Sequence, residues 1–368
     1  MTRTGEAAMA LGPDHIGTAR LSRRVVLSAL GAGALSLASS NTARAAPTKL
    51  SDRASLAPSP AMPLIMATGA PGGGFSLYGP AFATLAEQSL HLPIAFRASG
   101  GSVANILLLE QNEAQLGMAS LAIANQAWMG SARWTGGLKM RGFRALFPIY
   151  QQQFQIVSLV HGKIRQLDDL AGQRIGVGPR GGTGAVLAPG LLRVTGVQGA
   201  KLITGGYDQQ IAALRTGALD ACAFFGASPL PAIARAASGG QFRLIGLTAP
   251  SSRAAGSFDP GVSASIVPRT ALPGLTRPVM TVGSPAMALA RADLPDPIAA
   301  ALTEAALLHQ ANLLATARIA VPAHDVWQAG IDTVAIHPGA VPVLRRHGIV
   351  VPDKLIGKPL GLPKLVKG

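Results

Sequence analysis

The stretch Leu64-Ile-Met-Ala-Thr-Gly-Ala-Pro-Gly-Gly-Gly-Phe-Ser-Leu-Tyr78 joins an apolar run to a loop with four glycines and one proline. The run Leu64–Thr68 is typical of a buried strand. From Phe75 onward apolar residues recur at helical spacing, which predicts a helix over Phe75–Gln88. A strand, a glycine loop and a helix in this order present backbone N–H groups at a helix N-terminus, which suits an anion. The alternative is a tight turn whose glycines serve only the backbone conformation.

Two further segments repeat this arrangement. Ser99-Gly-Gly-Ser102 follows a predicted strand, Pro93–Ala98, and precedes a predicted helix, Val103–Asn112. Gly178-Pro-Arg-Gly-Gly-Thr-Gly184 follows the predicted strand Arg174–Val177 and opens another helix. Alternation of strands and helices predicts an α/β fold with a largely parallel sheet. Loops at the carboxyl ends of such strands are where ligands bind, so we expect the glycine loops to face one cleft.

The domain organisation follows from breaks in this alternation. Phe143–Tyr150 and Phe154–Val160 are predicted as extended segments with only Gln151-Gln-Gln153 between them, which indicates a crossover between two lobes. Residues 249–275 are rich in Pro, Ser and Gly and are predicted to be a loop that returns to the first lobe. Lobe 1 is therefore expected at 63–149 and 249–348, lobe 2 at 150–248, and a C-terminal tail at 349–368.

A single long helix is expected over Pro297–Leu314, with Asp296 as its N-cap. The segment His337-Pro-Gly-Ala340 is predicted to be a turn and cap before a further apolar helix.

The first 46 residues have the features of an export signal. Ser22-Arg-Arg-Val-Val-Leu-Ser28 is followed by an apolar segment, and Ala43-Arg-Ala45 forms a cleavage site of the A-x-A kind. The paired arginines resemble a twin-arginine signal. Residues 47–62 are predicted to be a flexible lead-in. We therefore expect a periplasmic protein that is soluble after cleavage near Ala45.

Composition excludes several classes of function. The formal net charge is +15, but the basic residues are scattered and aromatics are only 4%, which argues against nucleic-acid binding. The single cysteine, Cys222, lies in an apolar run, so we expect a buried structural thiol and no internal disulfide. The seven histidines lack metal spacing, and no G-x-S-x-G motif is present. We expect no catalytic residues, no metal, no cofactor and no enzymatic activity.

The candidate ligand-binding residues come from the glycine loops and from the strand ends beside them. Backbone amides and hydroxyls are expected to bind an anionic group, and Phe75 to form part of the wall. Asn105 either orients the ligand or serves the loop backbone, and Arg180 is either a cationic contact or a solvated side chain. Phe225 is also expected to reach the cleft. The candidates are Gly73, Gly74, Phe75, Ser76, Ser99, Gly100, Gly101, Ser102, Asn105, Gln151, Arg180, Gly181, Gly182, Thr183, Phe224 and Ser228.

Several motifs carry a family resemblance. Thr68-Gly-Ala-Pro-Gly-Gly-Gly-Phe75, Ala98-Ser-Gly-Gly-Ser-Val-Ala-Asn105 and Leu167-Asp-Asp-Leu-Ala-Gly-Gln-Arg-Ile-Gly-Val-Gly178 occur in order, followed by Asp220-Ala-Cys-Ala-Phe-Phe225 and His337-Pro-Gly-Ala340. Together they resemble the TAXI class of solute-binding proteins, the receptors of tripartite ATP-independent periplasmic (TRAP) transporters. The resemblance covers about residues 63–348.

This resemblance implies a type II periplasmic-binding-protein fold, in which two α/β lobes joined by a hinge hold the ligand between them. It also implies a monomer that captures a small organic anion, dicarboxylate- or amino-acid-like, by lobe closure and delivers it to a TRAP-type membrane permease. The sequence departs from the family where Phe75-Ser76 stands in place of the usual paired tyrosines. The amides of Gln151-Gln-Gln153 stand where the family tends toward proline and acidic residues.

Two alternatives remain open. A receptor of a tripartite tricarboxylate transporter has the same fold and a glycine-rich first loop, although Ser99-Gly-Gly-Ser-x-x-Asn105 favours the TAXI class. A periplasmic enzyme with a nucleotide cofactor could also use a strand, a glycine loop and a helix. However, Gly69-x-x-Gly72-Gly-Gly74 does not match the G-x-G-x-x-G pattern of dinucleotide sites.

Overall fold

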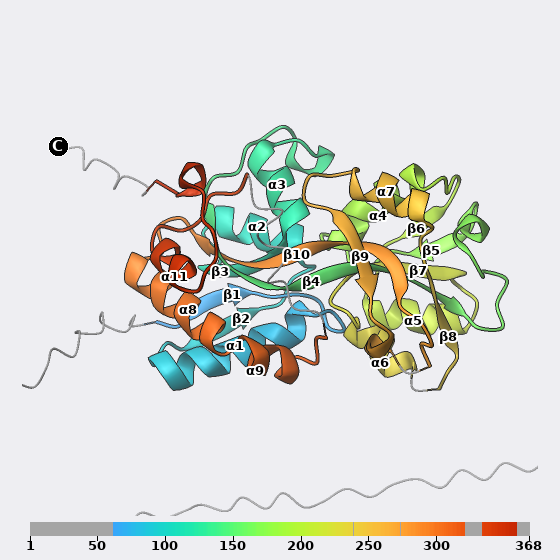
Figure 1. The fold of residues 1–368 in the computed structure, drawn as a ribbon, viewed down its shortest axis with the longest axis horizontal. Helices are drawn as coiled ribbons and strands as arrows, with labels where there is room; N and C mark the ends of the chain where they lie inside the picture. The colour runs from blue at the N-terminus through green and yellow to red at the C-terminus, as the bar shows by residue number, and fades with distance from the viewer. Residues whose placement is uncertain (1–61, 238, 273, 321–332, 359–368) are drawn as a thin grey trace, which may run out of the picture. The chain divides into compact units, whose positions relative to one another are not determined.

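The computed structural model describes residues 62–237, 239–272, 274–320 and 333–358 (Figure 1). The predicted export signal, the lead-in up to residue 61 and the last part of the predicted tail, 359–368, lie outside the described residues.

Within the described residues, ten strands form one sheet. They are β1 (Leu64–Ala67), β2 (Ile94–Arg97), β3 (Leu116–Ser120), β4 (Phe143–Leu159), β5 (Arg174–Gly176), β6 (Lys201–Ile203), β7 (Ala221–Gly226), β8 (Phe242–Ile245), β9 (Ser263–Val267) and β10 (Val279–Arg291).

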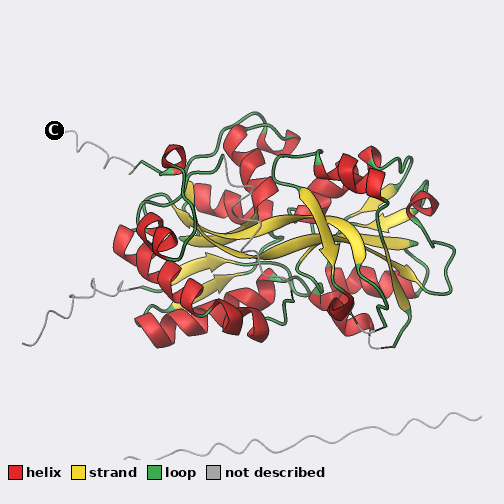
Figure 2. Ribbon diagram, in the orientation of Figure 1, coloured by secondary structure: helices red, strands yellow, loops and turns green. Residues whose placement is uncertain are grey.

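Helices cover both faces of this sheet (Figure 2). They are α1 (Phe75–Leu90), α2 (Ser102–Glu110), α3 (Leu121–Met129), α4 (Thr183–Val194), α5 (Tyr207–Arg215), α6 (Pro231–Ala237), α7 (Ala249–Gly256), α8 (Asp296–Leu308), α9 (Gln310–Thr316) and α11 (Ala340–Arg346). Short 3-10 turns occur at η1 (Arg133–Thr135), η2 (Leu167–Leu170), η3 (Arg269–Ala271) and η4 (Asp353–Leu355).

The sheet consists of two halves with the same internal pattern. The strand order is β2-β1-β3-β10-β4-β7-β5-β6, and β8 pairs with the second part of β4. In each half the first strand is central and parallel to its two neighbours: β1 lies between β2 and β3, and β5 lies between β6 and β7. In both halves a long antiparallel strand comes next in the sheet: β10 pairs with β3 in the first half, and β4 pairs with β7 in the second. The two halves are the cores of two α/β lobes.

Strands β4 and β10 connect the lobes. They pair with each other antiparallel from Phe143 opposite Arg291 to Gln153 opposite Gly283. Beyond this stretch β4 continues into the second half beside β7, and β10 begins beside β9. Two α/β lobes joined by a pair of crossing strands form the type II periplasmic-binding-protein fold that the sequence predicts.

Several local predictions differ from the structure. Residues 151–153 are not a break, because β4 runs without interruption from Phe143 to Leu159. The segment predicted as a loop over 249–275 contains α7 and β9. The hydroxyl of Thr248 caps α7 by accepting the Ser251 N–H at 3.3 Å, and β9 is held by pairing with β10, a tertiary contact that composition does not reveal.

The predicted helix over Pro297–Leu314 is two helices. α8 ends at Leu308 and α9 begins at Gln310, with a bend of 73° between them. Asp296 is not the N-cap, because it is the first helical residue and Pro295 precedes it as the cap. Among the described residues no single helix is long and apolar enough to cross a membrane, and α8 and α9 reach that length only as this bent pair.

The beginning of the predicted tail is part of the folded core. Ile349, Val351 and Leu355 are buried, and Ile356 forms a bridge with Ile336. The preceding His337 behaves as the predicted turn, because its Nδ1 accepts the Gly339 N–H at 3.2 Å just before α11 begins.

The crossing of β4 and β10 requires a residue without a side chain at position 283. A Cβ on Gly283 would lie 2.5 Å from the carbonyl oxygen of Gln152, and a backbone atom in a paired strand cannot move aside. We therefore expect Gly283→Ala to lower the free energy of unfolding by about 1–3 kcal/mol, as overpacked sites do. The urea midpoint of the mature protein measures this effect.

The matched control for this substitution is Gly239→Ala, where the nearest atom to the new Cβ is 3.8 Å away. Its midpoint should stay at the wild-type value. Equal midpoints for the two variants would show that the crossing tolerates a methyl group.

Candidate functional site

Three glycine-rich loops leave the carboxyl ends of parallel strands and open helices. The first connects β1 to α1 through residues 68–74, the second connects β2 to α2 through 98–101, and the third connects β5 to α4 through 177–182. The first N–H groups of a helix have no partner within the helix, so each loop delivers unpaired donors and the positive end of a helix dipole. Two of these helices belong to the first lobe and α4 belongs to the second.

The second and third loops are in direct contact. The Val103 N–H of α2 donates to the Gly181 carbonyl at 2.9 Å, and the hydroxyls of Ser102 and Thr183 lie 2.8 Å apart. The absence of side chains at 100 and 101 makes this approach possible. A Cβ on Gly100 would overlap the Arg180 carbonyl oxygen, and Gly101 has a φ of +123° and lies against the Cα of Gly182. The two lobes are therefore closed against each other here.

The first loop also reaches across to the second lobe. The Gly72 carbonyl accepts the N–H of Ala232 in α6 at 3.1 Å. A Cβ on Gly73 would lie 3.0 Å from the ring of Tyr207, the first residue of α5. This loop thus rests on an aromatic ring of the opposite lobe.

A small cavity remains where the three loops meet. Its volume is about 20 Å³, enough for about one water molecule. Within the described part of the chain no charged side chain lines it. The lining residues are Gly69, Ala70, Gly73, Gly74, Phe75, Gly100, Gly101, Ser102, Tyr150, Gln152, Gly182, Thr183, Tyr207, Phe225 and Gly226.

Neutral hydroxyl and amide groups provide the polar side chains of the cavity. The Thr183 hydroxyl lies 3.5 Å from Oε1 of Gln152, and a Cβ on Gly74 would lie 2.6 Å from the hydroxyl oxygen of Tyr150. Burial raises the pKa of Tyr150 well above its usual value, and it raises the pKa of Tyr207 to about 12. Both phenols are therefore protonated at neutral pH and can donate hydrogen bonds.

All three tyrosines of the chain gather around this site. The ring of Tyr78 lies 6.2 Å from that of Tyr150, and the ring of Phe75 lies 6.0 Å from it. Tyr207 packs edge-on against Phe224 at 5.1 Å. Aromatic hydroxyls are absent at 75 and 76 but are present nearby, at Tyr78 of the same helix and at Tyr150 and Tyr207 of other elements.

Asn105 holds the strand ends that carry the loops. Its side-chain amide is fully buried and donates to the carbonyl of Thr68 after β1 at 2.6 Å and to that of Met118 in β3 at 2.7 Å. Its oxygen accepts from the Ser99 hydroxyl at 2.5 Å, and that hydroxyl accepts the Gly101 N–H at 3.0 Å. Of the two roles proposed for Asn105, the geometry corresponds to support of the loop backbone.

The structure brings together about half of the predicted site residues. Those that line the cavity are Gly73, Gly74, Phe75, Gly100, Gly101, Ser102, Gly182 and Thr183, together with Phe225. Ser99, Gly181 and Asn105 lie directly behind the lining and hold it through the hydrogen bonds above. Ser76 also lies outside the lining, with its hydroxyl donating to the Gly73 carbonyl at 2.7 Å.

Four predicted residues lie elsewhere. Gln151 is buried but does not line the cavity, since its side chain points toward Gly283. Arg180 is exposed to solvent, so it corresponds to the solvated alternative. Phe224 packs in the second-lobe core, and Ser228 is fully buried outside the cavity.

The single cysteine, Cys222, is buried as expected, and burial raises the pKa of its thiol to about 12.

Sequence reasoning missed Tyr150, Gln152 and Tyr207, as well as Gly69, Ala70 and Gly226. Tyr150 and Gln152 share one face of β4, so alternation along an uninterrupted strand would have selected them over Gln151. Tyr207 follows Gly205-Gly206 and opens a helix after β6, and this position is the feature of the sequence that could have identified it.

Among the described residues no group of three or more His, Cys, Asp or Glu side chains could hold a metal ion.

The chain belongs to the NMT1-like family, whose model matches residues 66–348. Similar solved structures include MatC from Rhodopseudomonas palustris with bound malate (14% identity, 70% of this chain and 88% of that chain covered, TM-score 0.49). Others are a structure described as a periplasmic transporter (16%, 70% and 87%, 0.47) and the GluR0 ligand-binding core from Nostoc punctiforme in complex with L-glutamate (17%, 73% and 100%, 0.43).

Removal of the Asn105 amide should separate the roles of support and ligand contact. Asn105→Ala removes the amide donor from the carbonyls of Thr68 and Met118, whereas the Ser99 hydroxyl can still donate to the Thr68 carbonyl at 3.1 Å. A buried polar group that loses its partner costs about 1–3 kcal/mol, so we expect the free energy of unfolding to fall by about that amount, measured by urea denaturation without ligand.

The control for this substitution is Asn312→Ala, an exposed position on α9, which should change stability by less than about 0.5 kcal/mol. If the two variants were equally stable, the strand ends would be aligned without the amide, and a ligand contact would then account better for Asn105.

Proposed function

We propose that this member of the NMT1-like family is a periplasmic solute-binding protein. In this proposal it captures a small organic anion, dicarboxylate- or amino-acid-like, between its two lobes and passes it to a TRAP-type membrane permease. It carries out no chemical step on the solute.

The observation that carries the proposal is the meeting of the glycine loops of opposite lobes. Val103 and Gly181 are joined by a backbone hydrogen bond, and Ser102 and Thr183 by their hydroxyls. A site made of parts from both lobes is assembled only when the lobes close. A ligand that contacts both parts therefore favours the closed form, which is the basis of capture by lobe closure.

The anionic character of the ligand follows from the donors in the cavity. Three helix N-termini point toward it, and each carries roughly half a positive charge. The polar side chains there are the hydroxyls of Ser102, Thr183, Tyr150 and Tyr207 and the amide of Gln152, and no lining residue is charged. A carboxylate can accept hydrogen bonds from such groups without meeting a buried negative charge.

The size of the cavity sets how the ligand enters. A volume of about 20 Å³ admits one water molecule but no organic acid. Entry therefore requires the lobes to separate, and separation breaks the Val103–Gly181 hydrogen bond. In the loaded form a ligand carboxylate would accept the Val103 N–H in place of the Gly181 carbonyl. This exchange keeps the Val103 N–H hydrogen-bonded. The donor that holds the lobes together without solute would therefore also favour a solute with a negative charge.

The hinge for this motion is assigned to the stretch where β4 and β10 cross between the lobes. Two backbone connections bend more readily in a common direction than they twist, so the motion is closure rather than free rotation. The lobe boundaries at 149/150 and 248/249 remain our assignment, and the first falls inside β4.

The ligand class is tested by a thermal-shift screen of the mature protein with dicarboxylates, amino acids and aromatic acids, followed by calorimetric titration. A ligand at about 100 times its Kd stabilises by about 2.7 kcal/mol, which gives a clear rise in Tm. We expect a response to small carboxylates. A response only to neutral sugars would contradict the anionic assignment.

Lobe closure is tested with Gly100→Ala, whose new Cβ would overlap the Arg180 carbonyl oxygen of the opposite loop. The affinity for the carboxylate found in the screen should fall at least about tenfold, or 1.4 kcal/mol. X-ray scattering without solute should show that the variant is more expanded than the wild type, because the new Cβ prevents the contact between the loops. Gly239→Ala is the control with unchanged affinity, and equal affinity in Gly100→Ala would remove the loops from the site.

Export is tested by replacing the arginine pair with lysines. Arg23→Lys together with Arg24→Lys keeps the charge of the signal but removes the motif that the twin-arginine receptor recognises. We expect the precursor to stay in the cytoplasm, as seen by cell fractionation. Arg20→Lys should be exported normally, and normal export of the double variant would show that a different route is used.

A further inference from the structure

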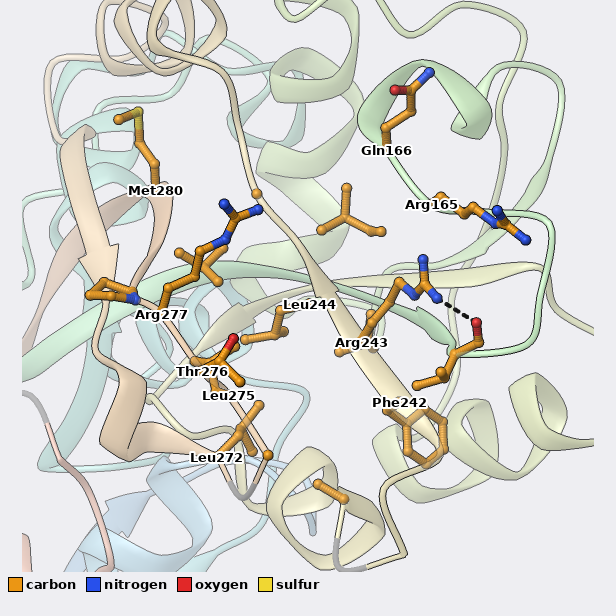
Figure 3. A pocket seen from close by; sticks show the side chains of 18 of the residues that line it. Arg165, Gln166, Phe242, Arg243, Leu244, Leu272, Leu275, Thr276, Arg277 and Met280 are labelled. Atoms are coloured by element: carbon orange, nitrogen blue, oxygen red, sulfur yellow. Dashed lines mark hydrogen bonds between the residues drawn. The ribbon is translucent and has the colours of Figure 1, made fainter.

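A second and much larger cavity lies between β8 of the second lobe and the segment that leads into β10. Its volume is about 660 Å³, within the range of small-molecule sites. It is bounded by the edge strand β8, by the segment 274–280 that leads into β10, and by Arg165 and Gln166 just before η2 (Figure 3). It shares no lining residue with the cavity between the glycine loops.

Three arginines and no carboxylate line this cavity. Arg243 projects from β8, Arg277 from the segment before β10, and Arg165 from the opposite side (Figure 3). Across the described ranges none of the three makes an ion pair. The guanidinium of Arg243 donates to the carbonyl of Val160, and the carboxylate of Asp169 accepts the backbone N–H groups of Arg165 and Gln166.

The carboxylate of Asp169 partly offsets the charge of Arg165, but the arrangement of Arg243 and Arg277 is unfavourable without a counter-charge. Like charges around one depression repel each other, and the repulsion is strongest where the wall has a low dielectric constant. Arg243 is half-buried, and its guanidinium is already oriented by a backbone carbonyl. A preoriented guanidinium loses less side-chain entropy when it binds a carboxylate, sulfonate or phosphate.

The wall below the arginines is apolar. Leu244, Leu272 and Leu275 lie beneath Arg243 and Arg277 in Figure 3, and Val157, Phe242 and Val279 extend this surface. An inorganic anion would use the arginines but would leave the apolar wall in contact with water. A neutral apolar compound would cover the wall but would leave the charges unpaired. A molecule with an acidic group on a hydrocarbon body satisfies both surfaces.

We propose that this cavity is a second binding site, which takes an amphipathic organic anion. Its acidic group pairs with Arg243 and Arg277, and its apolar body lies on the leucines of β8 and of the segment before β10. Arg165 lies at the far side with its guanidinium turned away from Arg277 (Figure 3), and it adds attraction over a longer distance. The site is distinct from the cleft, because the two cavities share no lining residue, although β4 contributes to both.

Titration with two fluorescent probes tests the proposal. 8-Anilinonaphthalene-1-sulfonate has an aromatic body and one acidic group, and N-phenyl-1-naphthylamine has the same body without it. The wild-type mature protein should bind the sulfonate at one site at least about tenfold more tightly than the amine. Added salt should weaken only the binding of the sulfonate. Equal affinity for both probes would overturn the proposal.

The residues are tested with Arg243→Gln combined with Arg277→Gln, which should lower the sulfonate affinity at least about tenfold. Arg193→Gln combined with Arg253→Gln removes the same net charge from two exposed positions outside the cavity and should change the affinity less than twofold. An equal loss in both double variants would overturn the site. If the double variant does not fold, the single variant Arg277→Gln replaces it, because Arg277 lies in an exposed loop. This single variant should still lower the sulfonate affinity severalfold.

Two measurements separate this site from the cleft and from a contact between two copies of the chain. Gly100→Ala should bind the sulfonate like the wild type, so failure of the cleft proposal and failure of this one give different results. Sedimentation velocity tests whether the surface instead joins two copies. A dimer that dissociates in the Arg243→Gln, Arg277→Gln variant, together with no sulfonate binding, would overturn the proposal.

Discussion

The antiparallel pairing of β4 with β10 is the constraint on which the rest of the structure depends. These two strands are shared by both halves of the sheet, so their register sets where each lobe begins. A shift by one residue would turn every side chain to the opposite face and would take Tyr150 and Gln152 away from the glycine loops. The register of β10 against β4 is irregular between Pro285 and Met287, opposite the part of β4 that contains Tyr150. The absence of a side chain at position 283 allows the two strands to cross closely.

The site that this crossing supports is made largely of backbone. Glycines bring the loops of opposite lobes within hydrogen-bond distance, and Asn105 fixes the strand ends from behind. The side chains that reach the cavity are neutral donors, among them the phenols of Tyr150 and Tyr207. Neutral donors cost less to desolvate than arginines would on closure, so the lobes can approach to contact without leaving a buried charge unpaired.

The features that sequence predicts well here are local, and those it misses depend on contacts between distant segments. The strand–glycine loop–helix units and the approximate extents of α1 and α2 follow from periodicity and glycine placement. The choice of Gln152 over Gln151 depends on whether β4 is continuous, which its pairing with β7 and β10 decides. β9 exists because β10 is there to pair with it, and the break at His309 interrupts an apolar pattern that continues on both sides.

The distribution of positive charge likewise depends on the fold. Arg165, Arg243 and Arg277 are far apart in a sequence whose basic residues look scattered, and only the fold brings them to one cavity. In our two proposals the cleft and this cavity would therefore select anions by different physics. Helix N-termini and hydroxyls act over hydrogen-bond distances and discriminate by geometry, so ionic strength has little effect on them once the lobes close. Exposed guanidinium groups act over about a Debye length, roughly 8 Å at physiological salt, so their attraction depends on charge first and on shape second. The apolar wall then supplies the shape selectivity that charge alone lacks.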